Sequence, residues 1–390
     1  MARPLRHRHL DRLRTALDSH PSLHLMKRLL LLAPLLFAAC SPAPPPVPRD
    51  AAGNELSEPF VRVSGQPTPT DTARFLAGRP VRNGAGLSNF QQSANYQTYS
   101  RGMLQKWKYR AARRLDRQDA WQSQHIVPLI GTPRTLLYPF GGPDLMHAIS
   151  MFPASTHYIL LGLEPAGQLP DLENTDAGLV AAALPRNAKS VETQLLHGYF
   201  ITKDMRNDLN NGPLQGVTPI LLTSLGLMHA TVTDVRSISA GGNPSIQIDF
   251  ILPDRGRKTV TYVSGDISNG RFGSLQSWLS SNASGSVAYF KAASYLMHDG
   301  NFSSVRNWVL GNCRATVQDD SGIPYRAYDP AKWNIHLFGN YQAPIELFTK
   351  HTQADLRAAY AAAGPLPSLT FGSGYELKPE RANLMISIRK

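Results

Sequence analysis

Residues 134–164 form the succession that most constrains the fold: a strand, a glycine turn, a helix and a second strand. TLLYPF at 135–140 and HYILLGLE at 157–164 are short apolar runs, and GGPDLMHAISMF between them has the length of a short helix. A helix that connects two such strands makes them parallel neighbours, because parallel strands need a crossover connection. The sequence therefore predicts an α/β protein whose sheet has a parallel part.

An antiparallel part is predicted in the same sheet. ATVTDVRSI, SIQIDFILP and KTVTYVSGD follow one another with the turns AGGNP and DRGRK between them, a pattern typical of a meander. We expect further strands in SVAYFKAAS, CRATVQDD and LMISIRK, helices over 88–122, 190–209 and 353–363, and either a strand or a helix over 218–227. No linker rich in Pro, Gly and Ser interrupts 74–390, which indicates a single large α/β domain with a mixed, partly parallel sheet flanked by helices.

Near the N-terminus, Lys27-Arg28 is followed by eleven uncharged residues, 29–39, and then by Cys40. The run is too short to cross a bilayer as a helix, which takes about 20 apolar residues. This segment resembles the signal peptide of bacterial lipoproteins, with Phe37-Ala38-Ala39-Cys40 as the lipobox. The resemblance implies acylation of Cys40, by a diacylglycerol and an amide-linked chain such as palmitate, and several acyl chains hold a protein stably on a membrane. Ser41 is not acidic, which by the same resemblance implies the outer membrane, with the protein facing the periplasm.

The lipobox also divides the chain. We expect translation to begin at Met26, which makes residues 1–25 a wrongly assigned extension, although a long charged start of the signal peptide is the alternative. Residues 26–39 are then the signal peptide, 40–73 the lipidated cysteine with a Pro-rich linker, and 74–390 the globular domain. The second cysteine, Cys313, has no nucleophile motif around it, so we expect a buried free thiol.

The net charge of +12 is unevenly distributed along the chain. Residues 1–39 carry seven basic and two acidic side chains, which leaves 33 basic and 26 acidic ones from Cys40 onward. The densest basic cluster is a set on one predicted helix: Lys106, Lys108, Arg110, Arg113, Arg114 and Arg117. A solvated helix face, or attraction to anionic lipid near the anchor, needs no more than this. We therefore do not expect nucleic acid as a partner, and we expect the membrane to be reached through the lipid.

The glycine turn invites comparison with a dinucleotide-binding unit of Rossmann type. Gly141 and Gly142 end the first strand, and Glu164 ends the next one 22 residues later, where such a unit places an acid for the ribose. Two features argue against it: the fingerprint has three glycines, and Asp144 places a negative charge where a pyrophosphate sits. Cytosolic cofactors such as nicotinamide nucleotides and S-adenosylmethionine are also rare in the cell envelope. The alternatives are a cleft for another ligand beyond the strand ends, or glycines that only shape a tight turn.

Several acids and histidines fall near the ends of predicted strands. His147 lies three residues after Asp144 on the predicted helix, where the pair suits a general base or a metal, or where the histidine is part of the core. Asp319 and Asp320 suit a divalent cation, or cap a turn beside Gly322. A polar site at one sheet edge would gather Asp144, His147, Glu164, Asp266, His298, Asp319 and Asp320.

YPFGGPD, MFP, GLEP, SYLMH and QDDSGIPYR are similar to stretches of uncharacterised exported bacterial proteins, and the similarity covers most of 125–390. It implies no activity, cofactor or site residue. Three hypotheses remain: a ligand-binding or interaction lipoprotein of the outer membrane, an envelope hydrolase that uses the acid and histidine cluster, and a Rossmann-like nucleotide-binding enzyme. The sequence does not assign the ligand, the protein partner, the cofactor or the metal.

Overall fold

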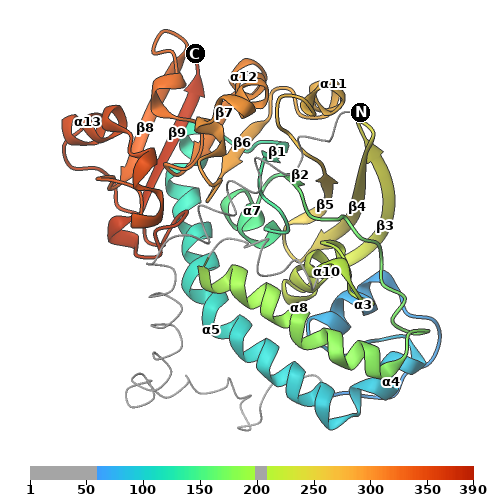
Figure 1. Ribbon diagram of the computed structural model, residues 1–390. Helices are drawn as coiled ribbons and strands as arrows, with labels where there is room; N and C mark the ends of the chain where they lie inside the picture. The colour runs from blue at the N-terminus through green and yellow to red at the C-terminus, as the bar shows by residue number, and fades with distance from the viewer. Residues whose placement is uncertain (1–58, 198–208) are drawn as a thin grey trace. The chain divides into compact units, whose positions relative to one another are not determined.

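The computed structural model describes residues 59–197 and 209–390, which are coloured in Figure 1. The export segment and Cys40 lie outside these residues, as do the last residues of the helix predicted at 190–209. Within the described part of the chain, no helix combines the length and the apolar character needed to cross a membrane.

In the described residues, nine strands form a single sheet in the order β3-β4-β5-β2-β1-β6-β7-β9-β8. The five central strands, from β5 to β7, are parallel to one another. β3 and β4 continue the sheet beyond β5 as an antiparallel hairpin, and β9 and β8 continue it beyond β7, also antiparallel. The strands are β1 (Thr135–Tyr138), β2 (His157–Gly162), β3 (Thr231–Ala240), β4 (Asn243–Leu252), β5 (Gly256–Ser264), β6 (Val287–Phe290), β7 (Ala315–Gln318), β8 (Trp333–Gly339) and β9 (Asn383–Arg389). The predicted mixed, partly parallel sheet and the antiparallel meander are confirmed.

The parallel strands are wound in two directions from β1. The chain moves outward from β1 to β2 and then to β5, and later returns to the other side of β1 to add β6 and β7. This is the order of a doubly wound α/β sheet, in which the direction of winding changes between β1 and β6. In such sheets, ligands bind beyond the carboxyl ends of the strands where the direction changes.

Helices cover both faces of the sheet, so the domain has three layers (Figure 1). Successive side chains of a strand point to opposite faces, and accordingly Leu136 and Tyr138 of β1 pack in one core while Leu137 packs in the other. The first core also holds residues of α3 (Pro69–Leu76), α4 (Ala85–Gln91), α5 (Ala94–His125), α6 (Val127–Ile130), α7 (Leu145–Met151), α8 (Ala177–His197) and α10 (Thr218–Leu227). The second core holds residues of α11 (Phe272–Asn282), α12 (Ser303–Asn312) and α13 (Ala354–Ala362). The 3-10 helices are η1 (Leu296–His298), η2 (Gly300–Phe302), η3 (Tyr325–Ala327), η4 (Glu346–His351) and η5 (Pro379–Arg381).

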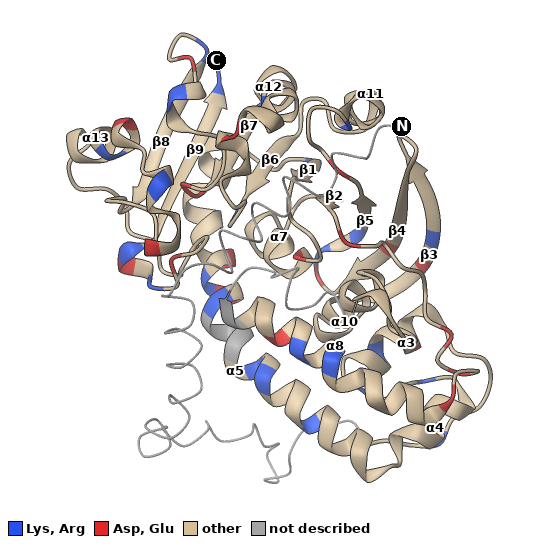
Figure 2. Cartoon of the chain, in the orientation of Figure 1, with Lys and Arg blue, Asp and Glu red and all other residues tan. Residues whose placement is uncertain are grey.

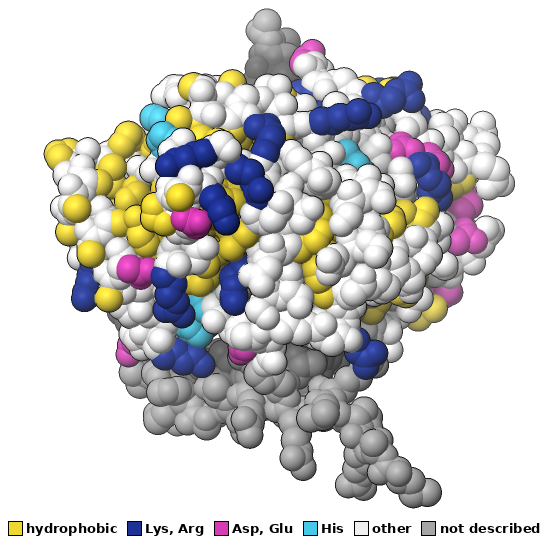
Figure 3. All heavy atoms as spheres, turned by 90° about the horizontal axis from the view of Figure 1, so that it is seen from above, with side chains coloured by type: hydrophobic (Ala, Val, Ile, Leu, Met, Phe, Trp, Pro, Cys, Tyr) yellow, Lys and Arg dark blue, Asp and Glu magenta, His cyan; other side chains and the backbone are white. Residues whose placement is uncertain are grey.

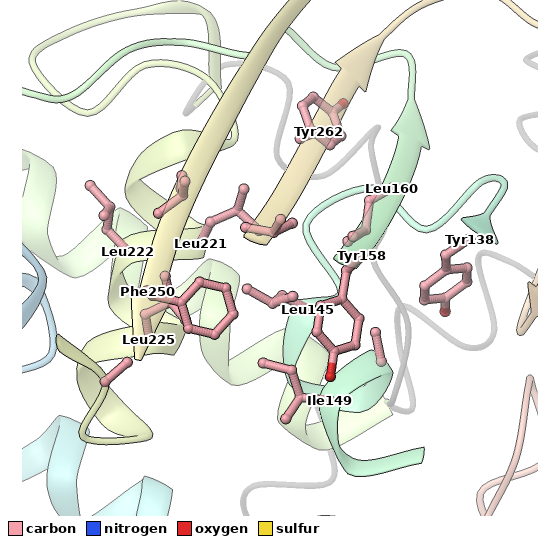
Figure 4. Packing of buried hydrophobic residues seen from close by; sticks show 14 of the residues in the cluster. Tyr138, Leu145, Ile149, Tyr158, Leu160, Leu221, Leu222, Leu225, Phe250 and Tyr262 are labelled. Carbon is pink, nitrogen blue, oxygen red and sulfur yellow. The ribbon is translucent and has the colours of Figure 1, made fainter. Parts of the chain in front are cut away.

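α7 and α10 lie deepest in the first core. Figure 4 shows Leu145 and Ile149 of α7 beside Tyr158 of β2, and the leucines of α10 beside Phe250 of β4. Every residue of α10 is buried, as is every residue of α7. A helix that is apolar on all sides has no periodic pattern, which explains why the sequence left 218–227 undecided between strand and helix.

The fold begins before residue 74, which corrects the predicted boundary between linker and domain. α3 starts at Pro69, and Thr68 caps it in a capping box with Asp71. The buried Asp71 carboxylate also accepts hydrogen bonds from the backbone N–H groups of Arg82 (2.7 Å) and Asn83 (3.1 Å). The last residues of the predicted linker are therefore part of the folded unit, which includes all described residues.

Candidate functional site

The loops that follow β1, β6 and β7 meet beside the point where the sheet changes its direction of winding. They bring Asp144, Lys291, Asp319 and Asp320 to the carboxyl edge of these strands. We call these loops and the η4 segment that contacts them the β6-edge site. Because this position is where doubly wound sheets hold their ligands, the β6-edge site is the candidate for function.

A buried ion pair closes the space between β1 and β6. Nζ of Lys291, the residue directly after β6, lies 2.6 Å from Oδ2 of Asp144, and the two side chains are 2% and 3% exposed. The Tyr138 hydroxyl donates to the same oxygen at 2.8 Å. The other oxygen, Asp144 Oδ1, is buried and has no hydrogen-bond partner among the described residues. Such a pair is expensive to break from one side, because the remaining charge is left without a partner.

Burial shifts both members of this ion pair toward their neutral forms. It raises the pKa of Asp144, and the Lys291 charge opposes that shift. It lowers the pKa of Lys291 to about 8, and the Asp144 carboxylate opposes it. Each charge thus opposes the shift that burial produces in the other group.

The glycine turn does not offer a phosphate site. Asp144 stands at the N-cap of α7, where its carboxylate bonds Lys291 and Tyr138 and makes no bond to the helix itself. A Cβ on Gly141 would lie 2.7 Å from the Tyr138 ring, and Gly142 has a φ of 51°. These glycines therefore serve the turn and its packing, and a pyrophosphate would meet a carboxylate at this helix end.

Glu164 lies farther along the sheet, after β2. Its backbone carbonyl and its Oε2 accept hydrogen bonds from the Tyr262 hydroxyl of β5, at 2.9 Å and 3.2 Å. Gly162 makes room for this contact, since a Cβ there would lie 2.6 Å from Glu164 Oε2. Glu164 thus links β2 to β5 and is not one of the residues of the β6-edge site.

Asp319 and Asp320 follow β7 and are both deeply buried, but they serve different partners. Asp319 accepts hydrogen bonds from the backbone N–H groups of Ala292 and Ser321, each at 2.8 Å. Asp320 accepts from the Tyr295 hydroxyl at 2.6 Å and from the Asn383 amide at 2.9 Å. Burial raises the pKa of both carboxyls, that of Asp319 to about 7, and the adjacent Asp320 adds to that shift.

These two carboxyls hold the loop after β6 rather than a cation. No group of three or more His, Cys, Asp or Glu side chains in the described parts of the chain is arranged to bind a metal ion. A narrow hollow next to Asp320 is lined by polar and apolar side chains that include Gln318, Tyr325, Gln353 and Asn383. Asp319 caps the turn beside Gly322, because its carboxylate accepts a hydrogen bond from the backbone N–H of Ser321, the residue before this glycine.

His298 lies at the end of the same loop, in a cluster of aromatic and histidine side chains. Its ring centroid is 5.3 Å from that of Tyr295 and 5.7 Å from that of His351, and Tyr295 stacks on His351 at 4.7 Å. Tyr375 belongs to the same cluster through its contact with Tyr295, and its hydroxyl donates a hydrogen bond to the Ala292 carbonyl at 2.8 Å. Burial lowers the pKa of His298 to about 4, with His351 and Arg326 as further causes. His298 is therefore neutral near neutral pH.

The backbone of these loops is strained. Phe140, Ala292, Ser294 and Tyr295 have positive φ angles between 52° and 60°, in the left-handed region that favours glycine. Only two other described residues besides glycines share this conformation, His229 and Asp254, and both lie in turns next to strands. Strained residues persist only where their surroundings hold them, and they gather at ligand sites.

Two of the predicted site residues lie elsewhere. His147 is fully buried in the first core, with Nδ1 2.9 Å from Gln118 Oε1, so it is a core histidine and does not pair with Asp144. Asp266 is exposed after β5, where it accepts from the Ser268 N–H at 2.9 Å and caps a turn. The predicted assembly of seven acids and histidines is thus reduced to Asp144, His298, Asp319 and Asp320.

The sequence did not reveal several residues of the β6-edge site. Lys291 is a single lysine at the end of an apolar run. Such a lysine at a strand end can belong to a site or simply reach the solvent, so the sequence does not identify its role. His351 and Tyr375 come from segments distant in the chain, and only the fold brings them to Tyr295.

The basic cluster of α5 is partly occupied by contacts within the protein. Figure 2 marks in blue the positions of Lys and Arg along α5 and α8. Lys106 pairs with Glu192 of α8 at 2.6 Å, and Arg117 donates to the Thr370 carbonyl at 3.3 Å. Cys313 is buried, as expected, and burial raises its pKa to about 11.

Comparisons with known proteins matched no protein-family model, no curated protein and no solved structure. The physical features of the β6-edge site are therefore the basis for a function.

Proposed function

We propose that this protein binds a small ligand at the β6-edge site and is held in the bacterial outer membrane by lipid on Cys40. The observation that carries the ligand site is the strain described above: four left-handed residues other than glycine border the point where the sheet changes direction. This strain lowers the free energy of unfolding. A loop that has to keep one shape in order to bind a ligand explains why the protein tolerates that loss.

Binding has more support than hydrolysis. Asp319 and Asp320 accept hydrogen bonds from the protein itself, and Asp144 forms an ion pair with Lys291 through one of its two oxygens, so most of their bonding capacity is used within the protein. A nucleotide-binding enzyme of Rossmann type has the strand order in its favour, but Asp144 occupies the phosphate position at α7.

The ligand site is tested on the full-length chain, purified in detergent. Thermal unfolding is followed with a panel of sugars, amino acids, organic acids, phosphates and nucleotides, and stabilising compounds are examined by hydrogen exchange. We expect such a compound to protect the amides of residues 291–299 most strongly, because these form the loop after β6. Stabilising compounds that protect other segments and leave this loop unchanged would contradict the proposal.

The anchor is tested by growing bacteria that express the full chain with labelled palmitate. We expect label in the wild type and in Cys313→Ser, and none in Cys40→Ser, because only Cys40 follows the lipobox. Membrane fractionation then separates the inner from the outer membrane. An unlabelled, soluble wild-type protein would rule out the anchor without affecting the ligand site.

A further inference from the structure

His298 has a ring nitrogen that the protein leaves without a partner. Nε2 is buried and lacks a hydrogen bond to the described residues, while the backbone of Asp320 interacts with the imidazole and favours its protonated form. Buried polar atoms in folded proteins are almost always paired, and an exception calls for an explanation such as a ligand or an ion. The ring is held in place by its edge contacts with Tyr295 and His351, so this nitrogen has a fixed position.

Two arginines lie around this histidine. Nη1 of Arg306, in α12, donates to the carbonyls of Met297 (2.6 Å) and Asp299 (3.4 Å), which fixes the guanidinium beside η1. Arg326, in η3, is exposed and makes no hydrogen bond or ion pair with other described residues. Both arginines disfavour the protonation of His298, and burial lowers the pKa of Arg306, a shift to which Arg326 adds.

Both cationic and acidic groups lie around His298. The cationic or protonatable groups are Arg306, Arg326 and His351, and Lys350 acts on His351. Of the acids, Asp320 is occupied by Tyr295 and Asn383, while Asp299 offsets the charges of Arg306 and His351. Like charges that converge on one spot repel one another, and a bound anion removes that repulsion. On the face of the whole protein that Figure 3 draws, which is not specific to His298, Lys and Arg side chains are more widespread than Asp and Glu side chains.

We propose that the ligand of the β6-edge site carries an oxyanion, a phosphate or a carboxylate, which is bound by Arg306, Arg326 and Nε2 of His298. This inference rests on the proposed function and names the chemical class of its ligand. A guanidinium presents paired N–H donors that match the oxygens of such a group, and an imidazole N–H supplies a third donor. A metal cation would be repelled by the two arginines, and a neutral ligand would leave their repulsion in place.

The test uses inorganic phosphate, with succinate as the carboxylate probe, and the full-length protein in detergent. Calorimetry is expected to give a dissociation constant near ~1 mM for the stronger probe, and Arg306→Gln or Arg326→Gln to weaken it about tenfold each, or about 1.4 kcal/mol. Arg257→Gln changes an exposed arginine on β5 and is the matched control, with no expected effect. Circular dichroism confirms that each variant is folded.

A second measurement needs no variant. The anion favours the protonated imidazole, so the pKa of His298, about 4 in the free protein, should rise on binding, as followed by NMR. Binding should accordingly tighten as the pH falls toward that value.

Three results would overturn the inference. They are binding of neither anion below about 10 mM, binding that both arginine variants leave unchanged, and a His298 pKa that does not move. If a neutral compound protects residues 291–299 while both anions fail to bind, the proposed function stands and the oxyanion is wrong. If the anions bind through the arginines without protecting that loop, the loop is not the ligand site and the proposed function is wrong.

Discussion

Lys291 and Asp144 join the two halves of the sheet: Lys291 directly follows β6, Asp144 ends the loop after β1, and their charged groups lie 2.6 Å apart. The ion pair therefore spans the gap between the strands at which the winding reverses. In other doubly wound sheets this gap is open to a ligand. Here the protein fills this gap with its own side chains. The residues that we propose bind the ligand, His298, Arg306 and Arg326, come from η1 and α12, which follow β6 in the chain, and from η3, which follows β7.

The first prediction concerns this ion pair. Lys291→Met removes the cation and leaves a buried carboxylate alone, which should lower the free energy of unfolding by about 3–5 kcal/mol. The double variant Lys291→Met/Asp144→Asn removes both charges and should recover most of that loss. Urea denaturation of the three proteins measures the difference. A cost below about 1 kcal/mol for the single variant would show that the pair contributes little.

The second prediction concerns the strain after β6. Ala292 has a φ of 52°, so Ala292→Gly should raise the free energy of unfolding by up to about 1 kcal/mol, because glycine adopts this conformation freely. Ala293→Gly is the control, because Ala293 is buried next to Ala292 but does not have a left-handed backbone. This change should lower the free energy of unfolding by about 1 kcal/mol. Equal losses of stability in the two variants, measured by thermal unfolding, would mean that position 292 stores no strain.

The third prediction is a dependence of stability on pH. The pKa of Asp319 is raised by burial to about 7, from 3.8 in the unfolded chain, so between these values the folded protein keeps a proton that the unfolded chain releases. The contribution of this carboxyl is therefore complete below about pH 4 and is lost as the pH rises toward 7. Asp319→Asn does not titrate, so the fall of stability over this interval should be smaller in the variant. Denaturation at several pH values tests this, and parallel curves for the two proteins would refute it.

The fourth prediction concerns the two cysteines. The pKa of Cys313 is raised to about 11 by burial, and a thiol reacts only as the thiolate, so alkylation of the native protein should be very slow. If Cys40 is acylated, denatured protein isolated from membranes should take up one equivalent of reagent, and Cys313→Ser should take up none. Mass spectrometry counts the adducts. A second equivalent in the wild type would reveal a free Cys40.

The fold was largely predictable where a residue pattern is local. The alternation in SIQIDFIL follows from a strand with one face in the first core and the other face partly exposed, and β4 has that burial. The pattern failed where composition masks it. The sequence pattern does not predict α11, because four serines weaken its apolar face: Ser274, Ser277, Ser280 and Ser281. α8 begins at Ala177, well before the predicted start at 190, and it contains Pro185, a residue that usually interrupts a helix.

The candidate site was predictable only in part. Asp144, Asp319 and Asp320 follow strands directly, and strand ends meet at a shared edge, so their position follows from local sequence. Whether an acid is available depends on its partners, and Lys291, Tyr138 and Asn383 are joined to these acids only by the tertiary fold. His147 has the spacing of a catalytic pair but faces Gln118. Sequence spacing cannot distinguish these cases.

β9 lies between β7 and β8 although it follows both of them in the chain. Until residue 389 has been made, two strands already present have no neighbour on the side that β9 will fill, and their backbone groups stay open to other chains. Copies shortened by a few residues at this end would keep both edges open permanently. Completion of the sheet thus depends on residues 383–389, and copies that end before them should be the ones that aggregate or are degraded.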